Sequence, residues 1–425
     1  MSAAIVGAGS SGIAAAKVLH ERGMEFDCFE QSDQLGGLWR HRTKLGKTAA
    51  YSSLHINSSR RLSAYSDFPM PADWPDFPHR SQMAAYFDAY VERFGFRDRV
   101  RFETPVRRVS REGDRWRVSL EGGESSLYDA VIVANGHHWD PRWPEPMPPG
   151  HFDGEMLHSS AYDTPEPFAD RDVVVVGLGN SAVDIAAELG RVARSVILST
   201  RRGAHIVPKT LFGRPIDHYP NDPRVPFALR RWAYGAAVRF VQGDMRRYGF
   251  PAPDHKFVGA HPTISDAILP AISHGRVKVK PGVEALLGGG VRFTDGSEAP
   301  AGVILWCTGY RVSFPFFDPE FLSAPNNELP LFHRIFHPDH PGLYFLGLLQ
   351  PLGSTIPLAE AQAQWIADTL QGRYRLPPPE QMRARMERER REMAERYVRS
   401  DRHTMQVDHH TYLYEIRREQ RRGRL

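Results

Sequence analysis

A cluster of glycines near the start of the chain is typical of a turn that binds a pyrophosphate. Gly7, Gly9 and Gly12 follow the spacing G-x-G-x-x-G. Glycines at these positions permit a tight turn and let backbone amides approach phosphate oxygens at the start of a helix. Glu30 follows about twenty residues later, where an acid can accept hydrogen bonds from a ribose diol and would repel a 2′-phosphate. These residues predict a site for FAD or NAD rather than for NADP.

A second cluster has the same spacing but the opposite charge. Gly177, Gly179 and Ala182 fit G-x-G-x-x-A, and the strand expected after the following helix runs into Arg201 and Arg202. Guanidinium groups match the geometry of phosphate oxygens. An arginine pair can also simply keep a surface soluble, but its position at the strand end favours phosphate binding. The second site is therefore expected to take the 2′-phosphate of NADP.

Each cluster lies within the elements that would have to position it. Residues 3–6 form an apolar strand before the first turn, and residues 14–19 form a helical stripe after it. Residues 173–176 and 184–189 repeat the arrangement at the second turn. This strand–turn–helix–strand context distinguishes a dinucleotide fingerprint from a chance group of glycines. The sequence thus predicts an α/β fold with two Rossmann-like dinucleotide-binding domains.

Two similar strand ends indicate how these domains share the chain. Residues 128–144 and 301–316 each contain an apolar strand that ends in glycine and continues into an aromatic, proline-containing stretch. We expect the chain to leave and re-enter one domain there. The predicted FAD domain is discontinuous, 1–165 plus 305–425, with an NADP domain of 166–304 inserted. Residues 204–264 are expected to form irregular helices and loops, as a lid or as a packing insertion.

Composition narrows the class of protein. Cys28 and Cys307 are the only cysteines among 425 residues, and neither has a metal-type or C-x-x-C partner, so we expect buried thiols, a reducing compartment and no metal. The net charge of +4 is concentrated in residues 373–425, where a solvated helix of alternating Glu and Arg is favoured over an RNA- or membrane-binding tail. No stretch of about 18 apolar residues occurs, so no membrane-spanning helix is expected. The first predicted strand begins within a few residues of Met1, so no signal peptide is expected. We expect a cytoplasmic protein with no nucleic-acid or membrane partner, and a homodimer is one assembly that the sequence allows.

A third pattern connects the two predicted domains. Phe152, Gly154, His158 and Tyr162 fit F-x-G-x-x-x-H-x-x-x-Y, which resembles the fingerprint of the flavin-containing monooxygenases. The segments "EQSDQLGGLWR", "YSSLHINSSRRLSAYSDFPMP" and "GLYFLGLLQPLGSTIPLAEAQAQWIADTLQG" are similar to segments of that family, in the same order. His158 and Tyr162 could hydrogen-bond across the domain junction as a hinge latch, or His158 could be purely structural.

The resemblance implies a reaction cycle and a set of contacts. NADPH reduces FAD, O₂ adds to give a C4a-hydroperoxyflavin, and a soft nucleophile, an amine nitrogen or a sulfide sulfur, takes one oxygen atom. The activity would be like that of N,N-dimethylaniline monooxygenase, and Asn57 would be the catalytic amide. The implied FAD contacts are Gly7, Ala8, Gly9, Ser10, Ser11, Gly12, Glu30, Leu38, Trp39, Ser58, Gln350 and Ser354. The implied NADP contacts are Gly177, Gly179, Ser181, Ala182, Val183, Asp184, Arg201 and Arg202.

Other functions remain open from the sequence. A Baeyer–Villiger monooxygenase acting on ketones would use the same cofactors, although Tyr162 occupies a position where those enzymes usually have Trp. A disulfide reductase would need a redox cysteine pair, which Cys28 and Cys307 do not offer. A redox sensor that only binds both nucleotides belongs to another class and would release no oxygenated product.

Overall fold

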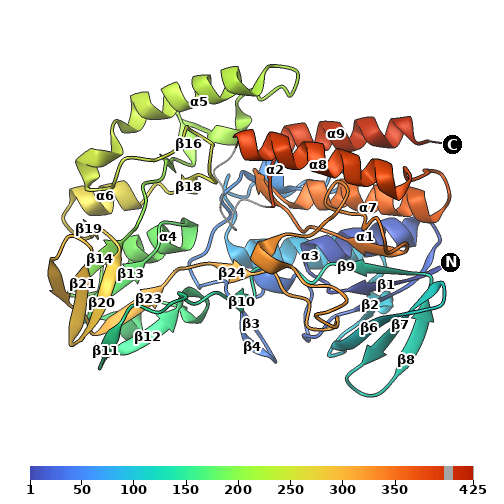
Figure 1. Ribbon diagram of the computed structural model, residues 1–425, viewed down its shortest axis with the longest axis horizontal. Helices are drawn as coiled ribbons and strands as arrows, with labels where there is room; N and C mark the ends of the chain where they lie inside the picture. The colour runs from blue at the N-terminus through green and yellow to red at the C-terminus, as the bar shows by residue number, and fades with distance from the viewer. Residues whose placement is uncertain (397–404, 425) are drawn as a thin grey trace. The chain divides into compact units, whose positions relative to one another are not determined.

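The chain is divided into two compact units in the computed structural model, which describes residues 1–396 and 405–424 (Figure 1). Unit one comprises Met1–Ala50, Leu54–Trp139 and Arg311–Leu425, and unit two comprises Tyr51–Ser53 and Asp140–Tyr310. Unit two begins before residue 166 and ends after residue 304, the bounds expected for the inserted domain, and those domain bounds stay a prediction. The assignment of one cofactor to each unit stays a prediction.

Strand pairing explains why unit two begins earlier than expected. β11 (Gly150–Phe152) pairs in parallel with β20 (Val283–Gly288), and β12 (Glu155–His158) pairs in parallel with β23 (Val303–Trp306). Residues 150–158 contain too few consecutive apolar side chains to be recognised as strands. Their partners lie more than a hundred residues away, so the pairing has no local signal.

A parallel sheet, five-stranded in the described residues, organises unit one, with the strand order β25-β9-β1-β2-β5. All its strand pairs run in parallel. β1 lies at the centre of this sheet, and its apolar residues are buried because a parallel sheet is covered on both faces. The carboxyl end of β1 leads directly into the first glycine turn. The strands are β1 (Ser2–Val6), β2 (Glu25–Phe29), β5 (Val100–Arg101), β9 (Ala130–Val133) and β25 (Leu343–Phe345).

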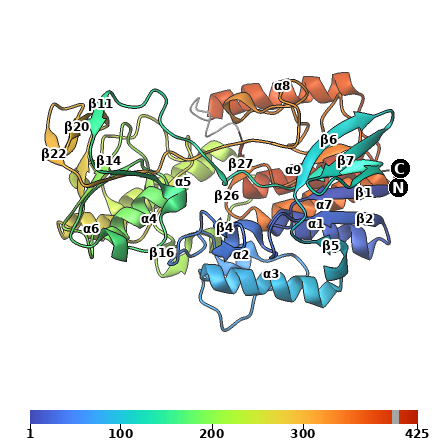
Figure 2. The ribbon, with the colours of Figure 1, turned by 90° about the horizontal axis from the view of Figure 1, so that it is seen from below.

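The helices of unit one are organised around the helix that follows this turn. The small and apolar residues of α1 (Ser10–Glu21) are buried, and α1 packs against α7 (Ile356–Leu370) and α3 (Arg80–Phe94). Figure 2 shows α3 and α8 at opposite edges of this unit. The other helices of unit one in the described residues are α2 (Arg60–Ser63), α8 (Pro379–Arg396) and α9 (His409–Arg422).

The arginine-rich end of the chain is helical where the structure describes it. On α8, Arg391 Nε lies 3.8 Å from a carboxylate oxygen of Glu387, one turn away. Arg385 Nη1 lies 2.5 Å from Oε1 of Glu419 and thereby joins α8 to α9. These pairs confirm the interpretation of a charged helix for the described part of the tail. Residues 397–404 and 425 of that prediction lie outside the described residues.

Smaller sheets complete unit one. β6, β7 and β8 form an antiparallel meander, β3 pairs with β4, and β26 pairs in parallel with β27. The meander packs its apolar face on a cluster rich in phenylalanine. The strands are β3 (Arg42–Thr43), β4 (Gly46–Lys47), β6 (Val106–Glu112), β7 (Arg115–Leu120), β8 (Ser125–Tyr128), β26 (Gln350–Leu352) and β27 (Gln406–Asp408).

Unit two contains its own parallel sheet, with the strand order β12-β23-β13-β14-β19. A smaller sheet, β11-β20-β21-β22, lies in the same unit. The apolar strand β13 runs into the second glycine turn, as β1 does into the first, and this repetition confirms the predicted α/β fold class. The further bounds are β13 (Asp172–Val176), β14 (Ser195–Ser199), β19 (Lys278–Lys280), β21 (Gly290–Phe293), β22 (Glu298–Pro300), α4 (Asn180–Leu189) and α6 (Ile268–Ser273).

Residues 204–264 are largely irregular, as expected from their composition. The main regular element is α5 (Phe227–Gln242), labelled in Figure 1. The side chains of Trp232 and Phe240 on this helix are exposed. Short strand pairs flank it: β15 (Ile206–Val207) with β18 (Thr263–Ile264), and β16 (Thr210–Leu211) with β17 (Arg214–Pro215).

Candidate functional site

The first glycine turn has a backbone that only glycine can form. Gly7 has φ +102°, and a Cβ atom there would lie 2.7 Å from the carbonyl oxygen of Ala134. A Cβ atom at Gly12 would lie 1.8 Å from the carbonyl oxygen of Gly7. Gly9 is the N-cap of α1, so the helix begins with free amides at the carboxyl end of β1. This cradle fits a pyrophosphate held by backbone N–H groups.

Glu30 lies beside this turn and is almost fully buried. Its Oε2 accepts a 2.7 Å hydrogen bond from the amide of Ala8, and its Oε1 accepts one of 2.9 Å from the amide of Ser32. A carboxylate can accept about four hydrogen bonds, so both oxygens keep capacity for hydroxyl donors. The geometry fits a ribose diol, and it adds a role that the sequence did not suggest, since Glu30 also fixes the turn itself.

The segment with Leu38 and Trp39 lies against the same turn. Gly36 donates its amide to the carbonyl oxygen of Ala8 at 2.9 Å. Gly37 has φ +53°, and a Cβ atom there would lie 3.1 Å from Cα of Gly9. The short helix Gly37–Trp39 therefore needs its two glycines to approach the pyrophosphate cradle so closely.

Asn57 carries a buried polar atom that finds no partner in the part of the chain that the structure describes. Its Oδ1 is shielded from solvent and accepts no hydrogen bond. The residues that follow it are well anchored: Ser58 Oγ lies 2.8 Å from Ser63 Oγ, and Ser59 Oγ caps α2 by accepting the amide of Leu62 at 3.3 Å. Buried acceptors are normally satisfied, and the exceptions call for a ligand, a water or a functional role. The amide thus fits the predicted function of contacting a bound molecule.

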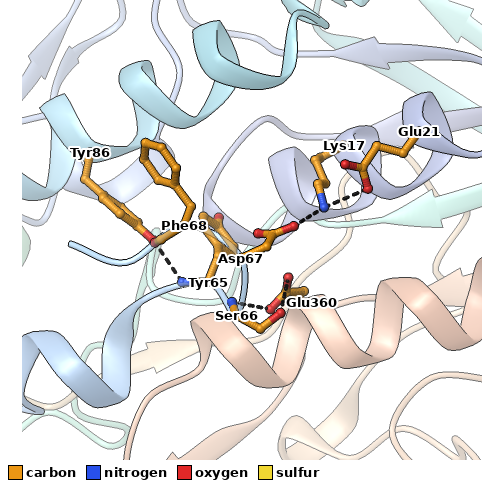
Figure 3. Close-up of polar contacts among 8 residues, drawn as sticks. All are labelled: Lys17, Glu21, Tyr65, Ser66, Asp67, Phe68, Tyr86 and Glu360. Atoms are coloured by element: carbon orange, nitrogen blue, oxygen red, sulfur yellow. Dashed lines mark hydrogen bonds and ion pairs between the residues drawn. The ribbon is translucent and has the colours of Figure 1, made fainter.

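The segment after α2 is tied both to α1 and to α3, and Figure 3 shows its Tyr65 beside Tyr86 of α3. The hydroxyl of Tyr65 donates to the carbonyl oxygen of Ser10 at 2.6 Å, and its amide donates to the hydroxyl of Tyr86 at 2.8 Å. Ser10 is the first residue of α1. Tyr65 therefore lies between the helix that starts at the glycine turn and the loop that carries Asn57.

Two charged groups hold the next residues of this segment in place (Figure 3). Glu360 on α7 accepts hydrogen bonds from the amide and the hydroxyl of Ser66, at 2.8 and 2.9 Å. Burial raises the pKa of Glu360, and the hydrogen bonds from Ser66 oppose that shift. Lys17 on α1 binds Asp67 and also lies 2.7 Å from Glu21. Burial alone would lower the pKa of Lys17, but its hydrogen bonds to Asp67 and Glu21 raise it.

The strand with Gln350 and the start of α7 lie next to α2. A Cβ atom at Gly353 would lie 3.2 Å from Cδ2 of Leu62. Ser354 is buried; its Oγ accepts the amide of Ile356 at 3.3 Å, and its carbonyl oxygen accepts from Nδ1 of His409 at 2.9 Å. Gly353, which lies between the predicted contacts Gln350 and Ser354, thus adjoins α2, and the roles of Gln350 and Ser354 toward a cofactor stay predictions.

The second glycine turn repeats the first in unit two. Gly177 has φ +137°, and a Cβ atom there would lie 2.5 Å from the carbonyl oxygen of Cys307. Gly179 is the N-cap of α4. Ala182 and Val183 are fully buried, so they can meet a nucleotide only through their backbone and by letting the helix pack closely. Ser181 is half-buried at the first turn of α4.

Arg201 and Arg202 are exposed directly after β14. A turn presents them: Thr200 Oγ1 donates to the carbonyl oxygen of Arg202 at 2.7 Å. Nε of Arg202 lies 4.0 Å from a carboxylate oxygen of Asp254, and both side chains are largely exposed. A surface pair of this kind is weak and leaves the guanidinium available for a phosphate.

Asp184 has a partner that the sequence did not reveal. The hydroxyl of Tyr51 donates to Oδ2 of Asp184 at 2.8 Å. Burial raises the pKa of Asp184, while the hydrogen bond from Tyr51 opposes the shift. One turn later on α4, Glu188 accepts a hydrogen bond from the hydroxyl of Tyr162. Asp184 thus anchors α4, and its predicted contact with NADP stays a prediction.

The fingerprint residues form a packed corner within unit two. His158 Nδ1 accepts the amide of Ser160 at 3.1 Å, so Nε2 carries the proton and donates to the carbonyl oxygen of Gly309 at 3.0 Å. Burial lowers the pKa of His158, and the bond to Gly309 opposes that shift. A Cβ atom at Gly154 would lie 2.6 Å from both Gly302 O and the Phe152 ring. These hydrogen bonds end on residues of unit two, so they do not form the expected latch across the junction.

Sequence reasoning missed Tyr51, Lys17 and Glu360. A signal was present for the two charged residues, since each interrupts the apolar stripe of a buried helix. Tyr51 gave none, because its partner is more than a hundred residues away. Cys28 and Cys307 are both free, but only Cys28 is buried as expected, because Cys307 is partly exposed. Desolvation raises the pKa of each thiol, that of Cys307 to about 12.

Neither a metal-binding cluster nor a membrane-spanning helix occurs in the described residues. In residues 1–396 and 405–424, no three His, Cys, Asp or Glu side chains come close enough together to hold a metal ion. In the same ranges, no helix combines the length and the apolar composition needed to cross a bilayer.

Relatives and solved structures resemble nearly the whole chain. Flavin-containing monooxygenase 5 of Rattus norvegicus is 35% identical over 435 residues, which cover 97% of this chain and 81% of the relative. The N-oxide-forming dimethylaniline monooxygenase 2 of the same organism is 33% identical, with 97% and 81% covered. S-allyl-L-cysteine S-oxygenase from Allium sativum superimposes with a TM-score of 0.74 and 26% identity, over 100% of this chain and 89% of that one.

A cyclohexanone monooxygenase has the same fold. It superimposes with a TM-score of 0.74 at 18% identity, over 99% of this chain and 96% of its own, which is evidence for the fold alone. Residues 2–420 match the family described as flavin-binding monooxygenase-like. The chain therefore belongs to the flavin-binding monooxygenase-like family and is a flavin-dependent monooxygenase that uses O₂ and a small-molecule substrate.

Proposed function

We propose that this enzyme uses FAD and NADPH to transfer one oxygen atom of O₂ to the nitrogen of an amine or the sulfur of a sulfide. The second oxygen atom leaves as water, and NADPH supplies the two electrons. Bound flavin supplies the activation of O₂. The observation that carries this proposal is the buried, unpartnered Oδ1 of Asn57, in a loop tied through Tyr65 to the first residue of the cofactor helix.

The residues of unit one support a flavin dinucleotide in particular. The cradle of Gly7 and Gly12 leaves room for backbone N–H groups to bind a pyrophosphate, and Glu30 has lone pairs left for a ribose diol. Asn57 would orient the reacting centre: its amide can donate from Nδ2 and accept at Oδ1 at once. A fixed amide in a shielded place stabilises developing charge without having to reorganise during the reaction.

The residues of unit two support NADPH as the reductant. The turn at Gly177 presents the amides at the start of α4, and Arg201 and Arg202 are exposed where a 2′-phosphate would need cations. Two relatives support the choice of substrate: the name of one refers to N-oxide formation on dimethylaniline and that of the other to S-oxygenation of a cysteine derivative. We extend both chemistries to this chain as soft-nucleophile oxygenation.

Product analysis tests this function. The purified enzyme is incubated with NADPH or NADH, O₂, and either trimethylamine, a thioether or a cyclic ketone. N-oxide or sulfoxide formed in proportion to NADPH consumed is the expected result. A lactone from the ketone, with no N- or S-oxide, would instead establish a Baeyer–Villiger enzyme. Consumption of NADPH without oxygenated product would leave only the redox sensor. The homodimer and the cytoplasmic location stay predictions.

A further inference from the structure

Gln406 has the most isolated polar side chain in unit one among the described residues. It is 0% exposed, and neither its amide nitrogen nor its amide oxygen has a hydrogen-bond partner within residues 1–396 and 405–424. A buried polar atom without a hydrogen bond destabilises the folded state, so a leucine would be the more stable choice for a purely structural position. An amide kept here at this cost points to a bound molecule.

The strand pairing shows which way this side chain faces. β27 begins at Gln406 and pairs in parallel with β26, with Gln406 opposite Gln350. Residues paired in this way point to the same side of the strands, and neighbours along a strand point to opposite sides. The next residue, Val407, belongs to the apolar core of unit one. Gln406 therefore faces away from Val407 and lies on the side of Gln350.

The chain that follows β26 adjoins the Asn57 loop. A Cβ atom at Gly353, just after β26, would lie 3.2 Å from Cδ2 of Leu62 on α2, and α2 is capped by Ser59, two residues after Asn57. Two amide side chains with unpartnered buried atoms, Asn57 and Gln406, thus belong to neighbouring segments of one unit.

We propose that Gln406 is a cofactor-binding residue whose carboxamide hydrogen-bonds the pyrimidine edge of the flavin. This inference rests on the proposed function, which places FAD in unit one. The edge of a flavin offers an imide N–H beside a carbonyl oxygen. A carboxamide is its complement, because Oε1 accepts from the N–H while Nε2 donates to the carbonyl oxygen. In such a pair, the donor and the acceptor of the carboxamide and those of the flavin edge are all hydrogen-bonded.

A comparison of two flavins tests the pairing without measuring turnover. Apoprotein freed of flavin is titrated with FAD and with 3-methyl-FAD, in which the imide N–H is blocked. We expect the wild type to bind 3-methyl-FAD about tenfold more weakly than FAD, as for the loss of a buried hydrogen bond of about 1.4 kcal/mol. Gln406→Leu should bind FAD about tenfold more weakly than the wild type and should discriminate little between the two flavins.

A control variant and the thermal unfolding midpoint distinguish weaker flavin binding from misfolding of the Gln406 variant. Gln381→Leu removes an exposed amide of α8 and should leave both affinities unchanged. The thermal midpoint of Gln406→Leu apoprotein should equal or exceed that of the wild type, because an unsatisfied amide is removed. In addition, Gln406→Glu should lower the midpoint potential of the flavin, since a carboxylate beside the pyrimidine ring opposes the charge of the reduced form.

The outcomes separate this inference from the proposed function. If Gln406→Leu binds FAD as the wild type does and still rejects 3-methyl-FAD, the pairing is wrong. If the variant binds both flavins normally but raises the KM of the substrate, Gln406 contacts substrate and the assignment to flavin is overturned. If the wild-type apoprotein does not bind FAD at all, it is the proposed function that has failed.

Discussion

The hydroxyl of Tyr162 donates a 2.7 Å hydrogen bond to Oε2 of Glu188 on α4. The same face of α4 carries Asp184, which accepts from Tyr51 at 2.8 Å, and the two tyrosine rings meet edge to face with centroids 6.0 Å apart. The last residue of the fingerprint therefore acts together with a tyrosine from far along the chain. Together they fix the helix whose first turn would bind the phosphates of the nucleotide.

Tyr162→Phe should destabilise unit two while preserving its packing. The phenylalanine ring keeps the contact with Tyr51, but Glu188 loses its donor, so we expect the free energy of unfolding to fall by about 1–2 kcal/mol. Urea denaturation monitored on this unit measures the loss. Tyr414→Phe, at an exposed site on α9, is the control and should change little. Equal stability of Tyr162→Phe and the wild type would show that the hydrogen bond is not what holds α4.

The glycine turns could be predicted from the sequence because their requirements are local. Gly7 and Gly177 have positive φ angles, and a backbone carbonyl lies where a side chain would begin. No other amino acid fits both conditions. Glu30 was predictable for a similar reason, since a single βαβ unit places it beside the turn.

The remaining features depend on contacts between distant parts of the chain. Tyr51 meets Asp184, Ser66 meets Glu360, and β11 and β12 join unit two through strands more than a hundred residues away. A tyrosine or a serine looks the same in the sequence whether its partner is water or a buried carboxylate. Gln406 was missed for the same reason, because only burial distinguishes it from a surface amide.

Asn57→Leu should separate oxygenation from cofactor binding. Loss of a fixed donor at a reacting centre typically lowers the rate about 10²–10³-fold. We expect oxygenated product per NADPH to fall by that order while NADPH is still oxidised and peroxide accumulates. FAD content, measured by absorbance after gel filtration, should stay at the level of the wild type. A variant that forms product normally would remove Asn57 from the mechanism.

Arg201→Ala combined with Arg202→Ala should change the nucleotide preference. Without the two guanidiniums the 2′-phosphate loses its cations, so the KM for NADPH should rise at least about tenfold, equivalent to about 1.4 kcal/mol. The KM for NADH should change little, since NADH lacks that phosphate. Arg214→Ala alters an exposed arginine of the same unit and serves as the control. A parallel rise in both KM values would mean that the pair has a general structural role.

The free energy of unfolding of unit one should fall at acidic pH because of His333. Burial lowers the pKa of its imidazole to about 4, with Arg385 and Arg334 acting in the same direction and Glu419 opposing them. The unfolded imidazole has a pKa of about 6.5, so below that pH the unfolded state takes up a proton that the folded state does not. The stabilisation that comes from keeping His333 neutral is therefore fully present above pH 6.5. It is lost as the pH falls toward 4, which lowers the free energy of unfolding by up to about 3 kcal/mol.

Denaturant unfolding between pH 7 and pH 4 measures this loss. His333→Gln should flatten the decline, because it removes the proton that only the unfolded state accepts. His151→Gln, which changes an exposed histidine, should leave the slope as in the wild type. A slope that is the same in His333→Gln as in the wild type would contradict the assignment.

Glu360 should be needed to hold the segment that follows Asn57. Its carboxylate accepts two hydrogen bonds from Ser66 in a buried place (Figure 3), so Glu360→Leu leaves two donors unsatisfied and should lower the free energy of unfolding by about 2–4 kcal/mol. Glu360→Gln keeps an acceptor oxygen and should lose less than half as much.

If the segment that contains Ser66 positions Asn57, the two Glu360 variants should also differ in coupling, which is the amount of product formed per NADPH oxidised. The variant that loses more stability should lose more coupling. Product formed per NADPH should fall slightly in Glu360→Gln and strongly in Glu360→Leu, at a temperature where both remain folded by circular dichroism. If Glu360→Leu kept the coupling of the wild type, Glu360 would stabilise the fold without positioning Asn57. The Asn57 loop would then keep its geometry without the hydrogen bonds between α7 and Ser66.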